Sequence, residues 1–524
     1  MVPSFGVPAP KTGVTYAAGM GHHAIGFRVV QAPAPTSAPT PREVPFVQRW
    51  VKQVKADPAK GPDPVRPYYH VRAILPIPPE NTPDKAIVAA GLDPRLHGHN
   101  HSPSLEVMPN GDLLALYFSA HPDEYSPDVA LLGTRLRAGA DEWDMPEVVL
   151  DLADVNDGPS LLWTDNEKVW MFWGPTRLIG SYPFLVTTTE DNGASFHEAW
   201  CAVVEGQAGP HARQPINTAV HDASGATYVP TDGEGGTSVL WGSRDNGVTW
   251  FDTGGRTGGR HTTYAMLSDG AILGMGGKNT AIEGYMPKSV SRDAGKTWAV
   301  TKTPFAALGA NQRPCVLKLA SGRLFFCGDF QDYGGRQPAG ITEYGSYTAL
   351  SDDDGESWRI KRLPGAQPHE AHIHDWPTLG YSVARQAPNG MIHIISSMNH
   401  PSLHFELNEA WILADGNSTQ ERPWLLDGKE SFAYASGAKQ YEVTYADGRR
   451  TGTETYWRED GAVQWRRAYT PEGRCTWTHF WPNGQKKCES IWIGGRCEGK
   501  AQRWDIDGNA ISSGRFIDGQ TIDW

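Results

Sequence analysis

One eight-residue phrase occurs four times in this chain of 524 residues. It reads SRDNGVTW at 243–250, SRDAGKTW at 291–298 and SDDDGESW at 351–358, and a looser copy, TEDNGASF, occupies 189–196. Recurrence at intervals of about 50 residues is typical of repeat architectures. The Asp-x-Gly core suits a tight turn, because the carboxylate bonds nearby backbone N–H groups and glycine tolerates positive φ. No nucleophile stands beside a base in the phrase, so we expect these octets to be structural.

The octets match the Asp-box, the bacterial neuraminidase repeat. Over residues 68–416 the chain therefore resembles the sialidase superfamily of β-propellers. The resemblance implies an all-β propeller in which the Asp-boxes lie on outer hairpins, away from the active centre.

Six predicted hairpins share one plan, in which an apolar strand leads into a tight turn and a second strand leaves it. Asn-Gly and Asp-Gly between alternating apolar strands are strong hairpin signals. The six turns are Asn110-Gly111, Asp165-Asn166, Ser224-Gly225, Asp269-Gly270, Ser321-Gly322 and Asn389-Gly390. They predict a six-bladed propeller over residues 68–416, and a seventh blade built from residues 46–90 is the alternative. We expect Tyr68–Ile77 to pair with the last blade, because an open ring leaves two unpaired edges.

The segments outside the propeller differ from it in composition. GHHAIGFRVVQAP, at 21–33, resembles the end of a formylglycine-generating-enzyme-type domain, so residues 1–33 are predicted to be a fragment of one. Residues 34–67 are predicted to be a proline-rich linker, because proline fixes φ and removes a donor. Residues 428–524 contain the turns YADG, REDG, WPNG and DIDG and resemble the MORN-like β-hairpin repeats of many bacterial proteins. We expect this tail to be separable and to bind a protein or a cell surface.

Composition argues against several classes of function. A formal charge of −12 argues against a nucleic-acid partner, and the absence of a run of about 18 apolar residues predicts no membrane span. The six cysteines include no Cys-x-x-Cys pair, so no metal and no cofactor are expected. Cys315 and Cys327 flank one predicted hairpin, where we favour two buried thiols over a disulfide. Residues 1–19 lack the basic and apolar regions of a signal peptide, so localisation stays open, and a longer chain could carry an export signal.

Candidate site residues follow from the position of the inner strands. In a propeller the first strand of each blade lines the central channel, and ligands bind at one mouth of it. Counting about eight to eleven residues back from each inner turn reaches that mouth. The residues there are His101, Asp157, Arg213, Arg260, Arg313 and Tyr381. Three guanidinium groups at one level predict a bound anion, because the arginine fork matches a carboxylate. The alternative is that each arginine pairs with an acidic neighbour and only braces the blades.

The sialidase resemblance implies roles for these residues. Sialidases use an arginine triad, a tyrosine nucleophile assisted by a glutamate, and an aspartate as the acid. The three arginines then bind the substrate carboxylate. LGYSVARQAPNG resembles the tyrosine strand of the family, so Tyr381 matches the nucleophile, with Asp157 as the acid. The chain departs from the family where GHNHSPSLEV, which contains His101, replaces the Arg-Ile-Pro motif, and where the glutamate helper is missing.

An arginine cluster with histidines and a tyrosine also resembles the sites of β-propeller polysaccharide lyases. There arginine neutralises a uronate carboxylate, and a histidine or tyrosine takes the C5 proton. Three further histidines are candidates for such a site: His99, His261 and His374. We therefore favour an enzyme that acts on an acidic glycan, either a sialidase-type exo-glycosidase or a uronate lyase. A non-catalytic lectin for acidic glycans and an interaction scaffold remain the alternatives.

Overall fold

The computed structural model describes residues 50–524, apart from 77, 80–81, 97–98, 121–123, 128, 153–154, 166, 176–181, 279, 310–311, 332–335, 369–375 and 400. The fragment predicted at 1–33, the first part of the predicted linker and His374 lie outside the described residues.

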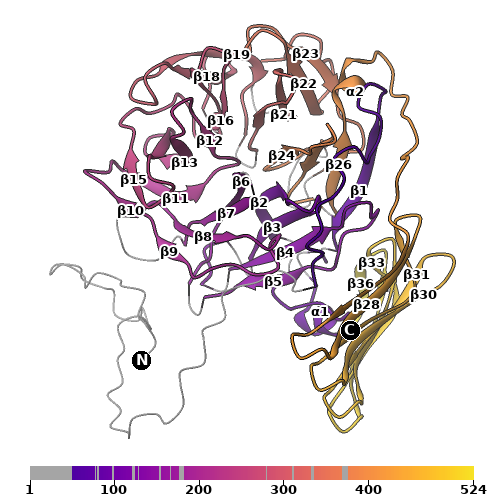
Figure 1. Cartoon of the computed structure of the whole chain (residues 1–524). Helices are drawn as coiled ribbons and strands as arrows, with labels where there is room; N and C mark the ends of the chain where they lie inside the picture. The colour runs from indigo at the N-terminus through magenta and orange to yellow at the C-terminus, as the bar shows by residue number, and fades with distance from the viewer. Residues whose placement is uncertain are drawn as a thin grey trace, which may run out of the picture.

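Six largely antiparallel sheets stand around one axis and form a closed ring of blades (Figure 1). This arrangement confirms the predicted six-bladed all-β propeller. Blades one and two contain β2 (His99–Val107), β3 (Leu113–Ala120), β4 (Ala130–Leu136) and β5 (Glu147–Leu150), then β6 (Ser160–Asp165), β7 (Lys168–Trp173), β8 (Leu185–Thr189) and β9 (Trp200–Cys201). Blade three contains β10 (Val203–Val204), β11 (His211–Pro215), β12 (Val220–His221), β13 (Thr227–Gly233), β14 (Ser238–Ser243) and β15 (Thr249–Asp252).

The second half of the ring has the same plan. Blade four contains β16 (Thr263–Met266), β17 (Ile272–Met275), β18 (Tyr285–Ser291) and β19 (Ala299–Ala306). Blade five contains β20 (Cys315–Lys318), β21 (Leu324–Phe330), β22 (Gly345–Ser351) and β23 (Arg359–Arg362). Blade six contains β24 (Val383–Gln386), β25 (Ile392–Ile395), β26 (Ser402–Leu407) and β1 (Tyr69–Leu75). Two short helices, α1 (Asp84–Ala89) and α2 (Glu409–Leu413), lie outside the blades.

The ring is closed by a strand from before blade one. β1 pairs antiparallel with β26, with Tyr69 opposite Leu407, so the outermost strand of blade six comes from the start of the propeller. This confirms the predicted pairing. The inner turns also form where the sequence places them, and Gly111 and Gly390 adopt φ values of 87° and 83°, which only glycine reaches without strain.

The Asp-boxes connect the third and outer strands of blades two to five. In the copy between β14 and β15, the Asp245 carboxylate accepts bonds from Ser243 Oγ at 2.9 Å and from the Thr249 backbone N–H at 2.9 Å. Trp250, which ends the phrase, is buried against blade two, 5.0 Å from the Phe184 ring. These bonds are local to the hairpin, so the phrase pins a turn and anchors one blade to its neighbour.

The centre of the ring is packed rather than open. Arg385, from β24, donates to the carbonyl oxygens of Leu162 at 2.8 Å and Asn217 at 2.7 Å, and its Nε donates to Glu106 at 2.8 Å. Asn217 in turn donates to the Pro314 carbonyl at 2.6 Å. Side chains of several blades therefore meet on the axis and join the blades below the mouth. In blade five, Cys315 of β20 and Cys327 of β21 lie directly opposite each other as buried free thiols.

The tail forms a single antiparallel sheet of hairpins beside the ring (Figure 1). Its strands are β27 (Gly428–Ala433), β28 (Lys439–Ala446), β29 (Arg449–Trp457), β30 (Val463–Tyr469), β31 (Arg474–Phe480), β32 (Lys486–Ile493), β33 (Arg496–Cys497), β34 (Gly499–Trp504), β35 (Ala510–Ile517) and β36 (Gln520–Asp523). This is the predicted hairpin module, while its likeness to MORN repeats stays a prediction.

One face of the tail sheet shares a core with the propeller. Trp143 of blade one packs in one cluster with Tyr441 and Tyr445 of the tail, and Ile87 of α1 packs in another with Trp477. The buried guanidinium of Arg450 donates to the buried Asp144 carboxylate. The expectation of a freely separable tail therefore does not fit the structure, because the junction buries aromatic rings and paired charges.

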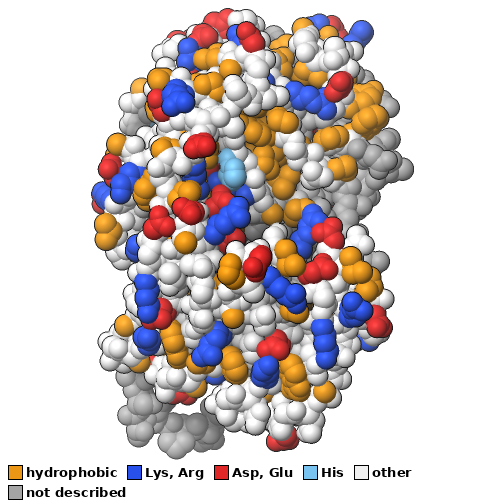
Figure 2. Space-filling view, turned by 90° about the vertical axis from the view of Figure 1, so that its right-hand side faces the viewer, with side chains coloured by type: hydrophobic (Ala, Val, Ile, Leu, Met, Phe, Trp, Pro, Cys, Tyr) orange, Lys and Arg blue, Asp and Glu red, His pale blue; other side chains and the backbone are white. Residues whose placement is uncertain are grey.

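Figure 2 shows the side of the molecule that includes the tail sheet, and its basic and acidic side chains are interspersed. Over the described residues on this face no large basic region forms. No helix within the described part of the chain is long and apolar enough to cross a membrane.

Candidate functional site

Tyr381 stands at the mouth of the axis, just before β24. Its neighbour across the gap between blades five and six is Arg313, and the two residues form an isolated parallel bridge. The guanidinium of Arg313 lies 5.1 Å from the centre of the Tyr381 ring. The His101 ring, from the start of β2, lies 4.1 Å from the same ring. With Arg260, whose charge also acts on Tyr381, the structure brings together four of the six residues that the count from the inner turns predicted.

The Tyr381 hydroxyl has two partners from blade four. His261 Nε2 lies 3.0 Å from the hydroxyl oxygen, and Lys278 Nζ donates to the same oxygen. His261 adopts φ of 54°, a left-handed conformation that is costly for a residue other than glycine. It is retained here because the surrounding bonds hold the imidazole in place. Tyr381 itself is only 1% exposed.

The other side of His261 faces Asp232, at the end of β13. The His261 backbone N–H donates to Asp232 Oδ1 at 2.8 Å, and its Nδ1 lies 3.0 Å from Oδ2. Arg260 Nε donates to Asp232 Oδ2 at 2.6 Å. Burial alone would raise the pKa of Asp232, but His261 and Arg260 outweigh it and the pKa falls to about 2. The carboxylate is therefore ionised, whereas burial lowers the pKa of His261 to about 4 and keeps it neutral.

Three cations surround the phenol. Arg313 is 1% exposed; its Nη2 donates to the Pro103 carbonyl at 3.1 Å, and neither its Nε nor its Nη1 has an acceptor among the described residues. Burial, reinforced by Arg260, lowers the pKa of Lys278 to about 8. Burial raises the pKa of Tyr381 above its ordinary value, while Arg313 and Arg260 act in the opposite direction.

A carboxylate that the inner-strand count missed also faces this cluster. Glu124 follows β3, and its Oε2 lies 3.9 Å from His101 Nε2. Its charge acts on Tyr381 and on Lys278, which places it at the same mouth. Its side chain is 38% exposed, so it can reach a molecule that approaches from solvent.

Asp157 lies at the same level on the neighbouring blade. Ser104 and Ser160, each three residues after His101 and Asp157, are joined by a 2.9 Å hydrogen bond between their hydroxyls. The Leu152 backbone N–H donates to Asp157 Oδ2 at 2.7 Å, and burial raises the pKa of this carboxyl to about 8. The described contacts of Asp157 are with loop backbone rather than with Tyr381.

Arg213 makes its contacts elsewhere. Its Nε donates to the Tyr182 carbonyl at 3.2 Å, and its guanidinium lies 4.4 Å from the centre of the Tyr182 ring, in blade two. The pairing of β11 with β13 is irregular between His211 and Pro215, so a simple count along this strand does not predict where Arg213 points. The backbone of His99 lies in β2, opposite Ala120.

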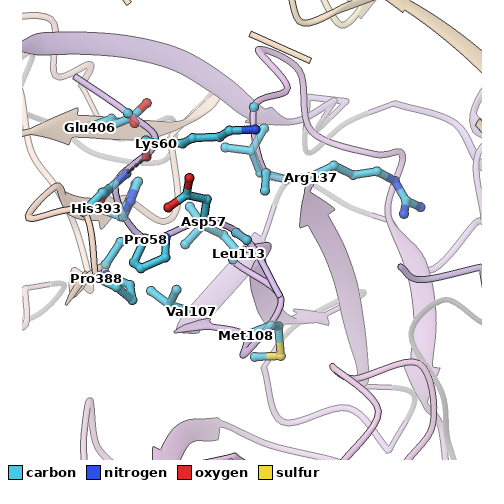
Figure 3. Close-up of a pocket in the computed structure, with 18 of the residues that line it drawn as sticks. Asp57, Pro58, Lys60, Val107, Met108, Leu113, Arg137, Pro388, His393 and Glu406 are labelled. Carbon is cyan, nitrogen blue, oxygen red and sulfur yellow. Dashed lines mark hydrogen bonds between the residues drawn. The ribbon is translucent and has the colours of Figure 1, made fainter. Parts of the chain in front are cut away.

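A cavity of about 310 Å³ lies at the opposite end of the axis, under residues 56–62 (Figure 3). Inner-turn residues of blades one and six line it. Its polar groups are bonded to one another or to the blades: His393 Nδ1 lies 3.0 Å from His404 Nε2, and Glu406 accepts from Arg72 at 2.8 Å. This network joins β1, β25 and β26, so we assign it to ring closure and place the candidate site at Tyr381.

Comparison with known families gives one match over much of the propeller. The model of the BNR repeat-like domain matches residues 111–394, more than half of the chain. The chain belongs to this family. No curated protein matches the sequence significantly.

Several solved structures are similar to this BNR repeat-like propeller at low sequence identity. A mutant of the NanB sialidase of Streptococcus pneumoniae is 12% identical over 60% of this chain and 69% of its own, with a TM-score of 0.42. Trypanosoma rangeli sialidase in complex with sialic acid is 12% identical over 83% and 75%, with a TM-score of 0.45. The α-L-arabinanase of Penicillium chrysogenum, complexed with arabinobiose, is 12% identical over 65% and 98%, with a TM-score of 0.42.

Three residues of the site in this BNR repeat-like propeller escaped the sequence analysis: Asp232, Lys278 and Glu124. Each lies near or beyond the end of the second strand of its blade rather than on the first strand. Asp232 is the second-last residue of β13, Lys278 follows β17, and Glu124 follows β3. Counting forward from the inner turns along the second strands would have found them. Among the described residues no group of three His, Cys, Asp or Glu side chains is arranged to hold a metal ion.

Proposed function

We propose that this BNR repeat-like propeller is an enzyme that cleaves a glycosidic bond in a carboxylate-bearing glycan at the Tyr381 end of its axis. The observation that carries the proposal is the buried Arg313 guanidinium, whose Nε and Nη1 lack acceptors among the described residues beside a phenol. Arg260 and Lys278 add positive charge to the same spot.

An anionic ligand satisfies this arrangement better than a neutral one. A buried cation with unmade hydrogen bonds is costly, and each charge-assisted bond is worth about 1.5–3 kcal/mol. A carboxylate accepts two parallel bonds from one guanidinium, which a sugar hydroxyl cannot do. Lys278 covers the Tyr381 hydroxyl, so a substrate has to displace it, and pairing with a carboxylate is one way to draw it aside.

The reaction we favour is hydrolysis through a tyrosine nucleophile. Tyr381 Oη attacks the anomeric carbon, and Glu124, which faces the same mouth, protonates the leaving oxygen. We therefore give the role of the acid, which the sequence predicted for Asp157, to Glu124, because Glu124 is near the cations and partly exposed.

Uronate elimination is the second candidate. The observation that favours it is the presence of two imidazoles around one phenol, with the His101 ring at 4.1 Å and His261 Nε2 at 3.0 Å. In that reaction Tyr381 takes the C5 proton of a uronate, and a second group protonates the leaving oxygen.

The test combines a substrate panel with three variants. The purified chain is incubated with p-nitrophenyl glycosides of sialic acid and glucuronic acid and with uronate polymers. Nitrophenol release or new reducing ends show hydrolysis, and new ultraviolet absorbance from a conjugated double bond shows elimination. Tyr381→Phe should abolish turnover while the ligand still binds, and Arg313→Gln should weaken binding about ten- to hundred-fold.

Arg256→Gln is the matched control. Arg256 pairs with Asp252 in blade three, away from the phenol, so this variant should bind and turn over like the parent. Binding without turnover in the parent chain would instead indicate a lectin for acidic glycans. Neither binding nor turnover with any acidic glycan would contradict the proposed function.

A further inference from the structure

We propose that His261 is the base that takes the proton of the Tyr381 hydroxyl, and that Asp232 is the residue that positions it. This inference rests on the proposed function and deepens it: the glutamate helper that the sialidase resemblance implies for the tyrosine is replaced by a histidine–aspartate pair from blades three and four. Three atoms define the arrangement, namely Asp232 Oδ2, His261 Nε2 and Tyr381 Oη.

The contacts of the imidazole fix which nitrogen holds the proton. Nδ1 lies 3.1 Å from Asp232 Oδ1 and 3.0 Å from Oδ2, and a carboxylate only accepts. Nδ1 therefore carries the hydrogen. Nε2 is then the bare nitrogen, and the group 3.0 Å away that can donate to it is the Tyr381 hydroxyl. The ring is thus oriented as a proton acceptor toward the phenol.

The fold holds this orientation rigidly. The Asp232 carboxylate bonds both the backbone N–H and the ring of His261, so the left-handed backbone of His261 and its side chain are fixed together. Arg260 occupies the other side of the carboxylate through Nε at 2.6 Å. Asp232 and His261 are 1% and 0% exposed, so water does not compete for these bonds. Such preorganisation is what a base needs, since it does not have to reorient during the reaction.

The charges around the phenol favour the transfer. Charged and titratable groups from five blades surround the imidazole and the phenol. They are Asp232 of blade three, Arg260 and Lys278 of blade four, Arg313 of blade five, Tyr381 of blade six, and His101 and Glu124 of blade one. When the proton moves, Asp232 stabilises the imidazolium, and the cations stabilise the phenolate. Lys278 is mainly protonated below pH 8, so it cannot accept the proton at neutral pH.

In the first step, the electron pair of the Tyr381 O–H bond forms the new bond from Oη to the anomeric carbon, and the proton goes to His261 Nε2. The bond from the anomeric carbon to the leaving oxygen breaks, its electron pair stays on that oxygen, and the Glu124 carboxyl supplies the proton. In the second step the ionised Glu124 takes a proton from water, which attacks the same carbon. Tyr381 Oη leaves with the electron pair of its bond and recovers its proton from His261.

The first arm of the test is kinetic, on the full chain with the p-nitrophenyl glycoside that the parent cleaves. Asp232→Asn and His261→Gln should each lower kcat by at least about a hundred-fold with little change in KM, the usual worth of a general base. In the parent, kcat/KM should rise with pH through a pKa of about 4, as His261 loses its proton and becomes able to accept the proton of Tyr381. The rise at low pH should vanish in His261→Gln.

A second histidine–aspartate pair serves as the matched control. His221 Nε2 lies 3.3 Å from Asp165 Oδ1 beside the inner turns, at the other end of the blades. Asp165→Asn and His221→Gln should leave kcat and its pH profile unchanged. If Asp232→Asn and His261→Gln keep kcat within about threefold of the parent and retain the acid limb, the inference is wrong even though the proposed function stands.

The second arm does not depend on activity or on a variant that folds. Ring-nitrogen chemical shifts are recorded on the intact protein labelled with ¹⁵N in histidine, and the His261 signals are identified by their coupling to the strongly shifted Nδ1 proton. We expect a neutral ring with protonated Nδ1 and bare Nε2 between pH 5 and 7. A ring protonated on Nε2, or an imidazolium at pH 7, would overturn the inference. A parent chain that cleaves no acidic glycan but shows this tautomer would contradict the proposed function alone.

Discussion

At the residue scale, burial decides how the charged groups of this molecule behave. His261 is fully buried and His479 is half-buried, and desolvation lowers the pKa of each, to about 4 and about 3. Asp232 is as buried as His261, yet its pKa falls, because partners on both sides hold it ionised. The same desolvation therefore gives a neutral base and a permanent carboxylate side by side, and the difference lies in which neighbours each group has.

Buried neutral histidines predict that stability falls in mild acid. The pKa of His479 is about 3 in the folded chain and 6.5 when unfolded, so between these values the unfolded chain binds the extra proton. Its contribution is fully present above pH 6.5 and is lost at up to about 1.4 kcal/mol per pH unit as pH falls toward 3. In urea titrations from pH 7 to 4, His479→Leu should show a shallower loss of unfolding free energy than the parent. An equal slope in both chains would contradict the assignment of a buried neutral ring.

At the element scale, two kinds of turn define the hairpins of blades two to five. The inner turns fix the register of the strands that face the axis, and the Asp-boxes fix the outer hairpins against the next blade. The bonds of an Asp-box carboxylate stay within the phrase, as in Asp245 with Ser243 and Thr249. Its aromatic residue, by contrast, packs across the gap between blades.

The aromatic end of an Asp-box should therefore matter more for stability than its carboxylate. Trp250 is 1% exposed and lies edge-on to Phe184 and Phe172 of blade two. Trp250→Ala should cost about 3–5 kcal/mol of unfolding free energy, and Asp245→Ala clearly less. Calorimetry on both variants measures the difference. Activity per folded molecule should be unchanged in each, and a selective loss of turnover in well-folded Asp245→Ala would indicate that the box takes part in chemistry.

At the scale of the whole molecule, the tail sheet and the propeller share buried apolar clusters. Tail residues Tyr441 and Tyr445 belong to the same apolar cluster as Trp143 and Leu136 of blade one. Arg450 reaches across the junction to Asp144, and both side chains are almost fully buried. Asp144 also pairs with Arg137 at 3.2 Å, so the loss of Arg450 takes one of two cations from a buried carboxylate, which is destabilising.

Removal of the tail should consequently destabilise the propeller. A chain that ends at Asp415 exposes Trp143 and Ile87 and leaves Asp144 without Arg450, so it should aggregate or unfold at a lower temperature than the parent. In the full chain, Arg450→Met should also lower the unfolding free energy, by less than the about 3–5 kcal/mol of a charge left with no partner, because Asp144 keeps Arg137. Thermal unfolding followed by circular dichroism checks both. Two separate transitions in the parent, or a soluble shortened chain with the parental midpoint, would show that the modules are independent.

Local patterns were enough to predict the architecture. Asn-Gly and Asp-Gly turns, period-two strands and the spacing of the Asp-boxes are properties of short segments, so they predict six blades. They also predict ring closure by Tyr68–Ile77, where the structure has β1 at Tyr69–Leu75. The same regularity placed His101, Arg260, Arg313 and Tyr381 at one mouth, because these residues stand at similar offsets from the inner turns.

Only the tertiary structure decided which polar groups meet there. Arg213 fails the count because its strand pairs irregularly. Asp232, Lys278 and Glu124 lie near or beyond the ends of second strands, where no sequence offset had been sought. Whether an arginine pairs with a neighbour or faces a ligand depends on the packing of adjacent blades, which no local pattern encodes. The docking of the tail is of the same kind, since its hairpin repeat predicts a sheet but not the surface that this sheet buries.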